Sequence, residues 1–360
     1  MAKTVLYIVI FIGLLSSGCS ENSYEKEITF IKSDTLTIQS DKHSYQNSKF
    51  KLSNNRKHLL ISQSRELLIL NLEKEEVIRQ INFDTLDLVL PQDLLYSITF
   101  DEESNSYSLF FPHRKKVILL DSNLHITKEI LLSGLDSVNH RIFPYNDSFF
   151  ISMKDERILV GTKLNTNEFS SPEYFKKSRL ISVFNFDGKL LSQFGEFPEV
   201  RKQNAFSVSS QGTNCLDVDL DNQKIYTKIS VGAPDLEVFN YEGDMIENGG
   251  LKSDKIDYTL YPTNGPNHIP GKYSDSHTEI KWINENLVAV KAFQFRDQEI
   301  PRYTDLNVVL IEDLANQKLY SKVIEPYHKL VYADEKEFRF VRTHPDMDEL
   351  IMVRVEYVLE

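Results

Sequence analysis

The chain has 360 residues, of which 41% are hydrophobic, and a formal net charge of −12. This hydrophobic content supports a sizeable core, and the acidic balance argues against non-specific nucleic-acid binding, which depends on phosphate neutralisation by Lys and Arg. The length allows one to three domains, but large all-β architectures of this size often form a single domain.

Residues 1–18 predict a signal peptide. Lys3 gives a positive start, and an apolar run from Val5 to Leu15 follows it. This run is shorter than the about 20 apolar residues that a spanning helix needs. The segment Leu15-Ser-Ser-Gly-Cys19 resembles a bacterial lipobox, with Ser16 where an aliphatic residue is usual. The alternative is an ordinary secretory peptide cut near Gly18.

The lipobox resemblance implies that Cys19 is lipidated and becomes the mature N-terminus, so that acyl chains anchor the protein to a membrane. Ser20 follows in place of the Asp that is associated with inner-membrane retention in similar lipoproteins. We therefore expect an outer-membrane lipoprotein of the cell envelope. It could face either the periplasm or the cell surface. With Cys19 acylated, Cys215 has no partner for a disulfide.

Residues 19–26 are predicted to be the lipidated Cys and a tether, and a strand segment begins at Glu27. After it, one pattern recurs: a hairpin, a short loop and a second hairpin with a polar turn. The second hairpins are residues 66–81, 116–130, 179–194, 235–248 and 305–324. A period of roughly 40–60 residues made of four short strands is typical of a β-propeller.

The repeats predict blades at about 45–82, 93–132, 138–195, 204–249 and 278–325, and a last one from 329 to the C-terminus. The last repeat has room for only three strands, so we expect the strand that starts at Glu27 to complete it. Such sharing closes the ring and removes two exposed sheet edges. The predicted fold is an all-β, six-bladed β-propeller of four-stranded antiparallel blades in a single domain, residues 27–360. Five or seven blades, an open β-sandwich and two small β domains are the alternatives.

Two of the hairpins, FNFDGKLLSQFG at 184–195 and VFNYEGDMIENGG at 238–250, resemble outer hairpins of six-bladed propellers of the TolB-like and NHL type. With the lipobox, nearly the whole mature chain is similar to Gram-negative lipoproteins that are recorded only as domains of unknown function with this fold. The resemblance implies a six-bladed propeller in the envelope and brings no catalytic residue.

Long insertions predict a binding face. They fall at 161–178, 249–279 and 295–304, all on the side of the propeller opposite the short turns. Basic and aromatic residues of this side are the candidate ligand or partner contacts: Arg114, Tyr174, Arg296, Arg302, Tyr303 and His344. Guanidinium groups bind carboxylate or phosphate, and aromatic rings pack on sugar faces, so we expect a small anionic or sugar-like ligand or an envelope protein partner. Charge neutralisation by nearby acidic residues and tolerated variation in loop length are the alternatives.

The sequence contains no catalytic motif and indicates no cofactor or metal site. Asp217-Val-Asp-Leu-Asp-Asn222 resembles the start of a calcium loop, but Asn222 stands where Gly is needed and Lys228 where Glu is needed. We therefore expect a binding or protein-interaction module that uses its long-loop face. The alternatives are a propeller hydrolase or lactonase with a metal in the central funnel, and a structural member of an outer-membrane assembly.

Overall fold

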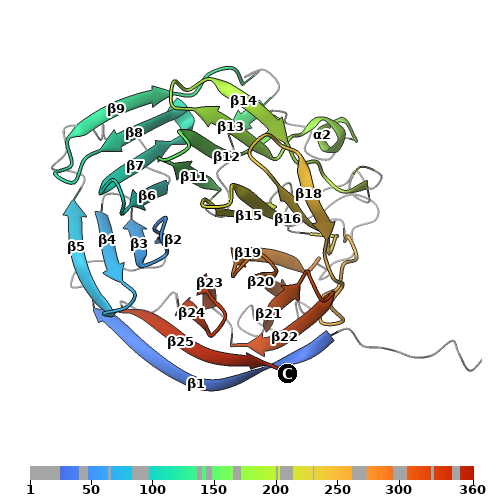
Figure 1. Cartoon of the computed structure of the whole chain (residues 1–360). Helices are drawn as coiled ribbons and strands as arrows, with labels where there is room; N and C mark the ends of the chain where they lie inside the picture. The colour runs from blue at the N-terminus through green and yellow to red at the C-terminus, as the bar shows by residue number, and fades with distance from the viewer. Residues whose placement is uncertain are drawn as a thin grey trace, which may run out of the picture.

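The structure is a computed structural model that describes residues 25–39, 48–63, 66–82, 97–135, 140–142, 148–164, 172–199, 202, 214–229, 231–261, 274–294, 306–325, 328–342 and 349–360. These residues form an all-β, propeller-like arrangement in which antiparallel sheets surround a central axis (Figure 1). Short strands such as β2, β6, β15, β19 and β23 lie innermost, and β5, β9, β14, β18 and β1 lie on the rim (Figure 1). No described helix is long and apolar enough to cross a membrane.

The first two sheets have four strands each, in chain order from the axis outward. The first contains β2 (Lys49–Leu52), β3 (His58–Gln63), β4 (Glu66–Asn71) and β5 (Glu76–Asn82). The second contains β6 (Ser97–Asp101), β7 (Ser106–Phe111), β8 (Lys116–Leu120) and β9 (Ile126–Leu131). A 3-10 turn, Pro112–Arg114, joins β7 to β8.

The third sheet has five strands because two short inner strands, β10 and β11, pair with different parts of β12. It contains β10 (His140–Ile142), β11 (Phe149–Ser152), β12 (Arg157–Leu164), β13 (Ile181–Asn185) and β14 (Leu190–Phe194), with α2 (Pro172–Lys177) between β12 and β13. The fourth sheet contains β15 (Asn214–Asp219), β16 (Lys224–Ile229), β17 (Leu236–Phe239) and β18 (Met245–Gly249).

The remaining strands form one eight-stranded sheet in the order β19-β20-β21-β22-β1-β25-β24-β23. Its strands are β19 (Ser276–Trp282), β20 (Leu287–Gln294), β21 (Leu306–Asp313), β22 (Lys318–Ile324), β1 (Glu25–Gln39), β25 (Glu349–Leu359), β24 (Glu337–Arg342) and β23 (His328–Ala333). The expected closure is confirmed, because β1 pairs antiparallel with β25 from Ile28↔Leu359 to Gln39↔Glu349.

The expectation of six separate blades is corrected: the described strands form five sheets. The cause is the length of β1, which extends beyond the end of β25. Its first residues, Glu25–Glu27, pair in parallel with Leu319–Ser321 of β22 and so join two strand groups into one sheet. The strand therefore begins at Glu25, inside the segment that was expected to be a tether.

Asn and Asp recur at the hairpin turns because their side chains accept turn N–H groups. Where the third strand of a repeat turns into the fourth, Asn71, Asp121 and Asn185 accept backbone N–H groups at 2.8–3.1 Å. Where the first strand turns into the second, Asp101 accepts the N–H of Ser104 at 2.9 Å, and Asp219 accepts that of Asn222 at 3.2 Å. The polar turns of the repeated sequence thus have a direct structural cause.

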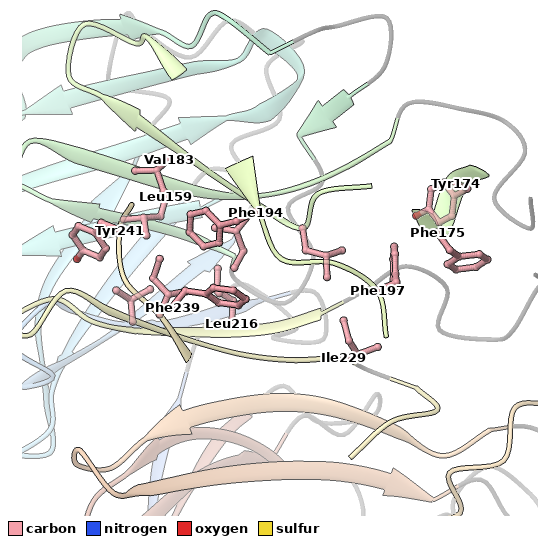
Figure 2. Close-up of a cluster of buried hydrophobic side chains, with 14 residues drawn as sticks. Leu159, Tyr174, Phe175, Val183, Phe194, Phe197, Leu216, Ile229, Phe239 and Tyr241 are labelled. Atoms are coloured by element: carbon pink, nitrogen blue, oxygen red, sulfur yellow. The ribbon is translucent and has the colours of Figure 1, made fainter. Parts of the chain in front are cut away.

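Six clusters of buried hydrophobic side chains fill the spaces between neighbouring strand groups of the described chain. In Figure 2, Leu159 and Val183 of the third sheet face Leu216 and Phe239 of the fourth. The cluster continues outward to Tyr174, Phe175 and Phe197 beside α2 (Figure 2). Packing of sheet face against sheet face is what holds the ring together.

Candidate functional site

A cavity of about 720 Å³ opens on the side of the propeller where the first strand of each repeat turns into the second, which we call the short-turn side. Turns of the first four sheets line it: Asn54, Asn55, Asp101, Glu102, Glu103, Ser104, Ser152, Met153, Lys154, Leu220 and Asp221. These turns are far apart in sequence, and the ring brings them together around the axis. The volume lies in the range of small-molecule sites, roughly 300–1,000 Å³.

The lining of this cavity is acidic. It contains four carboxylates, Asp101, Glu102, Glu103 and Asp221, against one lysine, Lys154. Asp101 and Glu102 also hold neighbouring turns together: Asn54 Nδ2 donates to Asp101 at 3.0 Å, and His58 Nδ1 lies 2.8 Å from Glu102 Oε1. Within the described part of the chain, Glu103 and Asp221 make no hydrogen bond or ion pair, and both are exposed. They are the carboxylates that a ligand meets first.

Next to the cavity, Arg56 ties the β2–β3 turn to the eight-stranded sheet. Arg56 donates from Nη1 to the carbonyl of Trp282 at 2.7 Å and from Nη2 to that of Ala333 at 2.8 Å. Its guanidinium also lies 4.8 Å from the ring centroid of Trp282 and 5.1 Å from that of Tyr332. Burial and a hydrogen bond to Asp334 raise the pKa of Tyr332 to about 12, so this phenol stays protonated at neutral pH.

Two smaller spaces lie among the inner strands. One of about 50 Å³ is bordered by Asn54, Arg56, Asp217 and Trp282 among others, and another of about 90 Å³ is bordered by Lys281 and Lys329 among others. Lys51 of the first sheet donates to the carbonyl of Phe149 in the third sheet, and its Nζ lies 4.0 Å from the ring centroid of Phe150. Of these three spaces, only the cavity of about 720 Å³ has the volume of a small-molecule site.

The segment that resembles the start of a calcium loop lies at the end of β15 and in the turn that follows it. Asp217 and Asp219 are 8% and 1% exposed, and Asp217 accepts the backbone N–H of Trp282 at 2.9 Å. Only Asp221 reaches the cavity mouth as an exposed carboxylate. The sequence analysis discounted this segment as a calcium loop. Its alternating Asp residues, on the first strand of a repeat that ends in a short turn, were the feature that could have indicated an acidic group at the cavity. Among the described residues, no group of three or more His, Cys, Asp or Glu is placed to hold a metal ion.

The residues predicted for the long-loop face are only partly described. Arg114 is exposed at the end of the 3-10 turn between β7 and β8. Tyr174 is fully buried in α2, where its ring packs 5.0 Å from that of Phe175 and 5.8 Å from that of Phe197. Its side chain thus belongs to the core and is not an exposed loop contact. Arg296, Arg302, Tyr303, His344 and Cys19 lie outside the described residues.

No protein-family model matches the chain, and no curated protein matches it. Its fold is similar to that of a crystal structure of a DUF4221 family member from Bacteroides vulgatus, with a TM-score of 0.71 at 12% identity over 93% of this chain and 98% of that one. A protein of Bacteroides fragilis that is provisionally named as exported aligns with a TM-score of 0.51 at 10% identity, over 92% and 98% of the two chains. A luciferin-regenerating enzyme aligns with a TM-score of 0.49 at 10% identity, over 90% of this chain and 95% of that one. These likenesses support the propeller-type fold alone.

Proposed function

We propose that this protein is a binding module of the cell envelope that takes its ligand in the acidic cavity of the short-turn side. The observation that carries the proposal is the cavity of about 720 Å³ with four carboxylates and one lysine in its lining. An excess of carboxylates attracts positive charge, and a concave site concentrates that attraction. The ligand class is therefore a cationic group, such as an amine or guanidinium, on a small molecule or a partner protein.

The scaffold is a six-bladed propeller in this proposal, with β19–β22 as one blade and β23–β25 with β1 as another. The six hydrophobic clusters support this interpretation, because a ring of six blades has six interfaces. The parallel pairing of Glu25–Glu27 with β22 is then an additional link between neighbouring blades.

The anchor is a lipid on Cys19, and the destination is the outer membrane. The leader-like run Val5–Leu15 before Cys19 supports export. The fold likeness to a protein provisionally named as exported agrees with this location.

The long-loop face remains a second proposed contact region, for a small anionic or sugar-like ligand or an envelope protein. Arg114 is exposed there. Replacing Arg114, Arg296 and Arg302 by Ala is expected to weaken capture of such a ligand, and unchanged capture removes this proposal. The metal-dependent hydrolase or lactonase has less support, since the described residues offer no metal-ligand cluster.

Titration calorimetry with spermidine, a small polycation, tests the acidic cavity. The Glu103→Gln/Asp221→Asn variant removes the two exposed lining carboxylates and should weaken binding by about tenfold or more. A matched control, Glu73→Gln/Glu242→Gln, removes the same charge from exposed outer turns and should change affinity by less than about twofold at moderate salt. Equal losses of affinity in the two variants would mean that spermidine binding depends only on net charge, which would contradict the cavity as its binding site.

A further inference from the structure

The start of the N-terminal strand is fixed to the rim of the propeller. Residues Glu25–Glu27 pair with β22, and Glu25 accepts hydrogen bonds from Ser253 Oγ at 3.0 Å, Asp254 N at 2.8 Å and Lys255 Nζ at 3.1 Å. Lys255 also donates to Ser321 Oγ at 2.6 Å. Although burial alone would raise it, hydrogen bonds from Ser321, Asp254 and Lys255 hold the pKa of the Glu25 carboxyl below its usual range. Any flexible connection between Cys19 and the propeller therefore ends at Glu25.

Only residues 20–24 separate Cys19 from this fixed point. Fully extended, that connection spans at most about 20 Å. A domain of this size is about 50 Å across. In Figure 1, β1 runs along one side of the ring, and β9 and β14 lie on the opposite side. An anchored Cys19 therefore keeps the β1 side near the bilayer and the β9 side away from it.

We propose that the propeller meets the bilayer edge-on, through the outer surface of β1 and the end of β25. This inference rests on the lipidation of Cys19 in the proposed function. Ile31 is 62% exposed, because an irregularity in the pairing after Phe30 leaves it without a partner residue on β25, and Val358 is 40% exposed. Leu131 on β9 is about as exposed as Ile31, so exposed apolar side chains alone do not decide which side faces the bilayer. The short connection from Cys19 to Glu25 decides it.

The charge of this surface is compatible with phospholipid head groups. The side chains of Lys32 and Arg354 are 57% and 36% exposed; Lys32 pairs with Asp34, and Arg354 pairs with Glu356 and with the buried Glu337. Apolar side chains between basic ones are suited to the interfacial region of a bilayer. In an edge-on orientation the propeller axis lies along the membrane plane, so the short-turn cavity opens sideways and remains accessible to soluble and membrane-bound ligands.

Fluorescence quenching measures the orientation. The full-length lipidated protein is placed in vesicles of phosphatidylethanolamine and phosphatidylglycerol that contain a head-group quencher. Single labels are attached at Lys32→Cys on β1, Lys128→Cys on β9, Glu156→Cys on the short-turn side and Lys176→Cys on α2. The native Cys215 is 1% exposed and so is protected from labelling. Quenching is expected to be several-fold stronger at position 32 than at 128, with 156 and 176 between them.

Two controls separate the orientation from the anchor. A long Gly/Ser linker inserted after Ser23 should abolish the difference between positions 32 and 128 while the protein stays on the vesicles. Cys19→Ala should remove quenching at all four positions. Strongest quenching at 156 or 176 in a vesicle-bound protein overturns the edge-on orientation and leaves the anchor intact. Recovery of the unmodified chain in the soluble fraction overturns the anchor, and the orientation with it.

Discussion

Arg56 and Trp282 are joined across the short-turn mouth of the propeller. Arg56 Nη1 donates a 2.7 Å hydrogen bond to the Trp282 carbonyl, and its guanidinium lies 4.8 Å from the centre of the indole ring. Arg56 has a backbone φ of 63°, which most residues avoid. In the next three sheets the residue with positive φ in this turn directly precedes the second strand: Asn105, Glu156 and Gln223, with φ of 48°, 52° and 54°. All four turns thus contain a residue with positive φ, and of these four residues Arg56 is the one whose side chain reaches the eight-stranded sheet.

Replacing Arg56 by Ala should lower the free energy of unfolding by about 2–4 kcal/mol, because two charge-assisted hydrogen bonds and two aromatic contacts are lost. Chemical denaturation measures this effect. Glu156→Ala is the control, since it changes another turn residue with positive φ at an exposed site of the same side and should alter stability by less than about 0.5–1 kcal/mol. Equal losses in the two variants would show that the cross-axis contacts do not contribute.

Lys228 and Glu312 form a fully buried ion pair between the fourth sheet and β21, with Nζ and Oε1 2.6 Å apart. Glu312 also accepts the backbone N–H of Leu251 at 3.3 Å. Glu312→Gln leaves the lysine charge buried without its counter-ion and should destabilise the protein by about 3–5 kcal/mol.

The double variant Lys228→Met/Glu312→Leu should recover most of that loss, because replacing both charges by apolar groups removes the desolvation penalty. A double-mutant cycle of Lys228→Met, Glu312→Leu and the double variant, from denaturant unfolding curves, measures the coupling. Simple additivity of the two single changes would contradict a direct interaction between the pair.

Burial, reinforced by Asp235 and Glu196, raises the pKa of the Glu237 carboxyl to about 7. A folded-state pKa above the unfolded value of 4.5 means that the folded protein binds the proton more tightly. The favourable contribution is complete below pH 4.5 and disappears as the pH rises through about 7. Glu237→Gln should therefore stabilise the protein by about 1–3 kcal/mol at pH 8 and have little effect near pH 4.5. A stability difference that does not change with pH would contradict the raised pKa.

Much of the fold was predictable because each repeat encodes its own turns. The polar turns at Asn71, Asp121 and Asn185 lie inside the predicted second hairpins of three repeats. The ends of those predicted hairpins agree with the observed strands within a few residues. The closing role of the N-terminal strand followed from the missing strand of the last repeat. The link of β1 to β22 was missed, because Glu25 and Lys26 have the composition of a tether and the pairing depends on a strand almost 300 residues away.

The site was harder to predict than the fold. Long loops are visible in a sequence, and they directed attention to the face that carries Arg114. A cavity built from four short turns is not visible there, because its formation depends on how Asn54, Asp101, Ser152 and Asp221 meet around the axis. Tyr174 was misplaced for a related reason: α2 turns its aromatic residues into the core, although the surrounding sequence is polar and basic.

Amide hydrogen exchange with and without spermidine tests the central claim most directly, because it reports both faces of the propeller in one experiment. Binding in the short-turn cavity should slow exchange in residues 53–57, 101–106, 152–157 and 219–224, and leave residues 112–116 and 174–179 unchanged. Slowed exchange confined to the latter two segments, or no change in the four turns at saturating spermidine, would contradict the assignment of the cavity as the binding site.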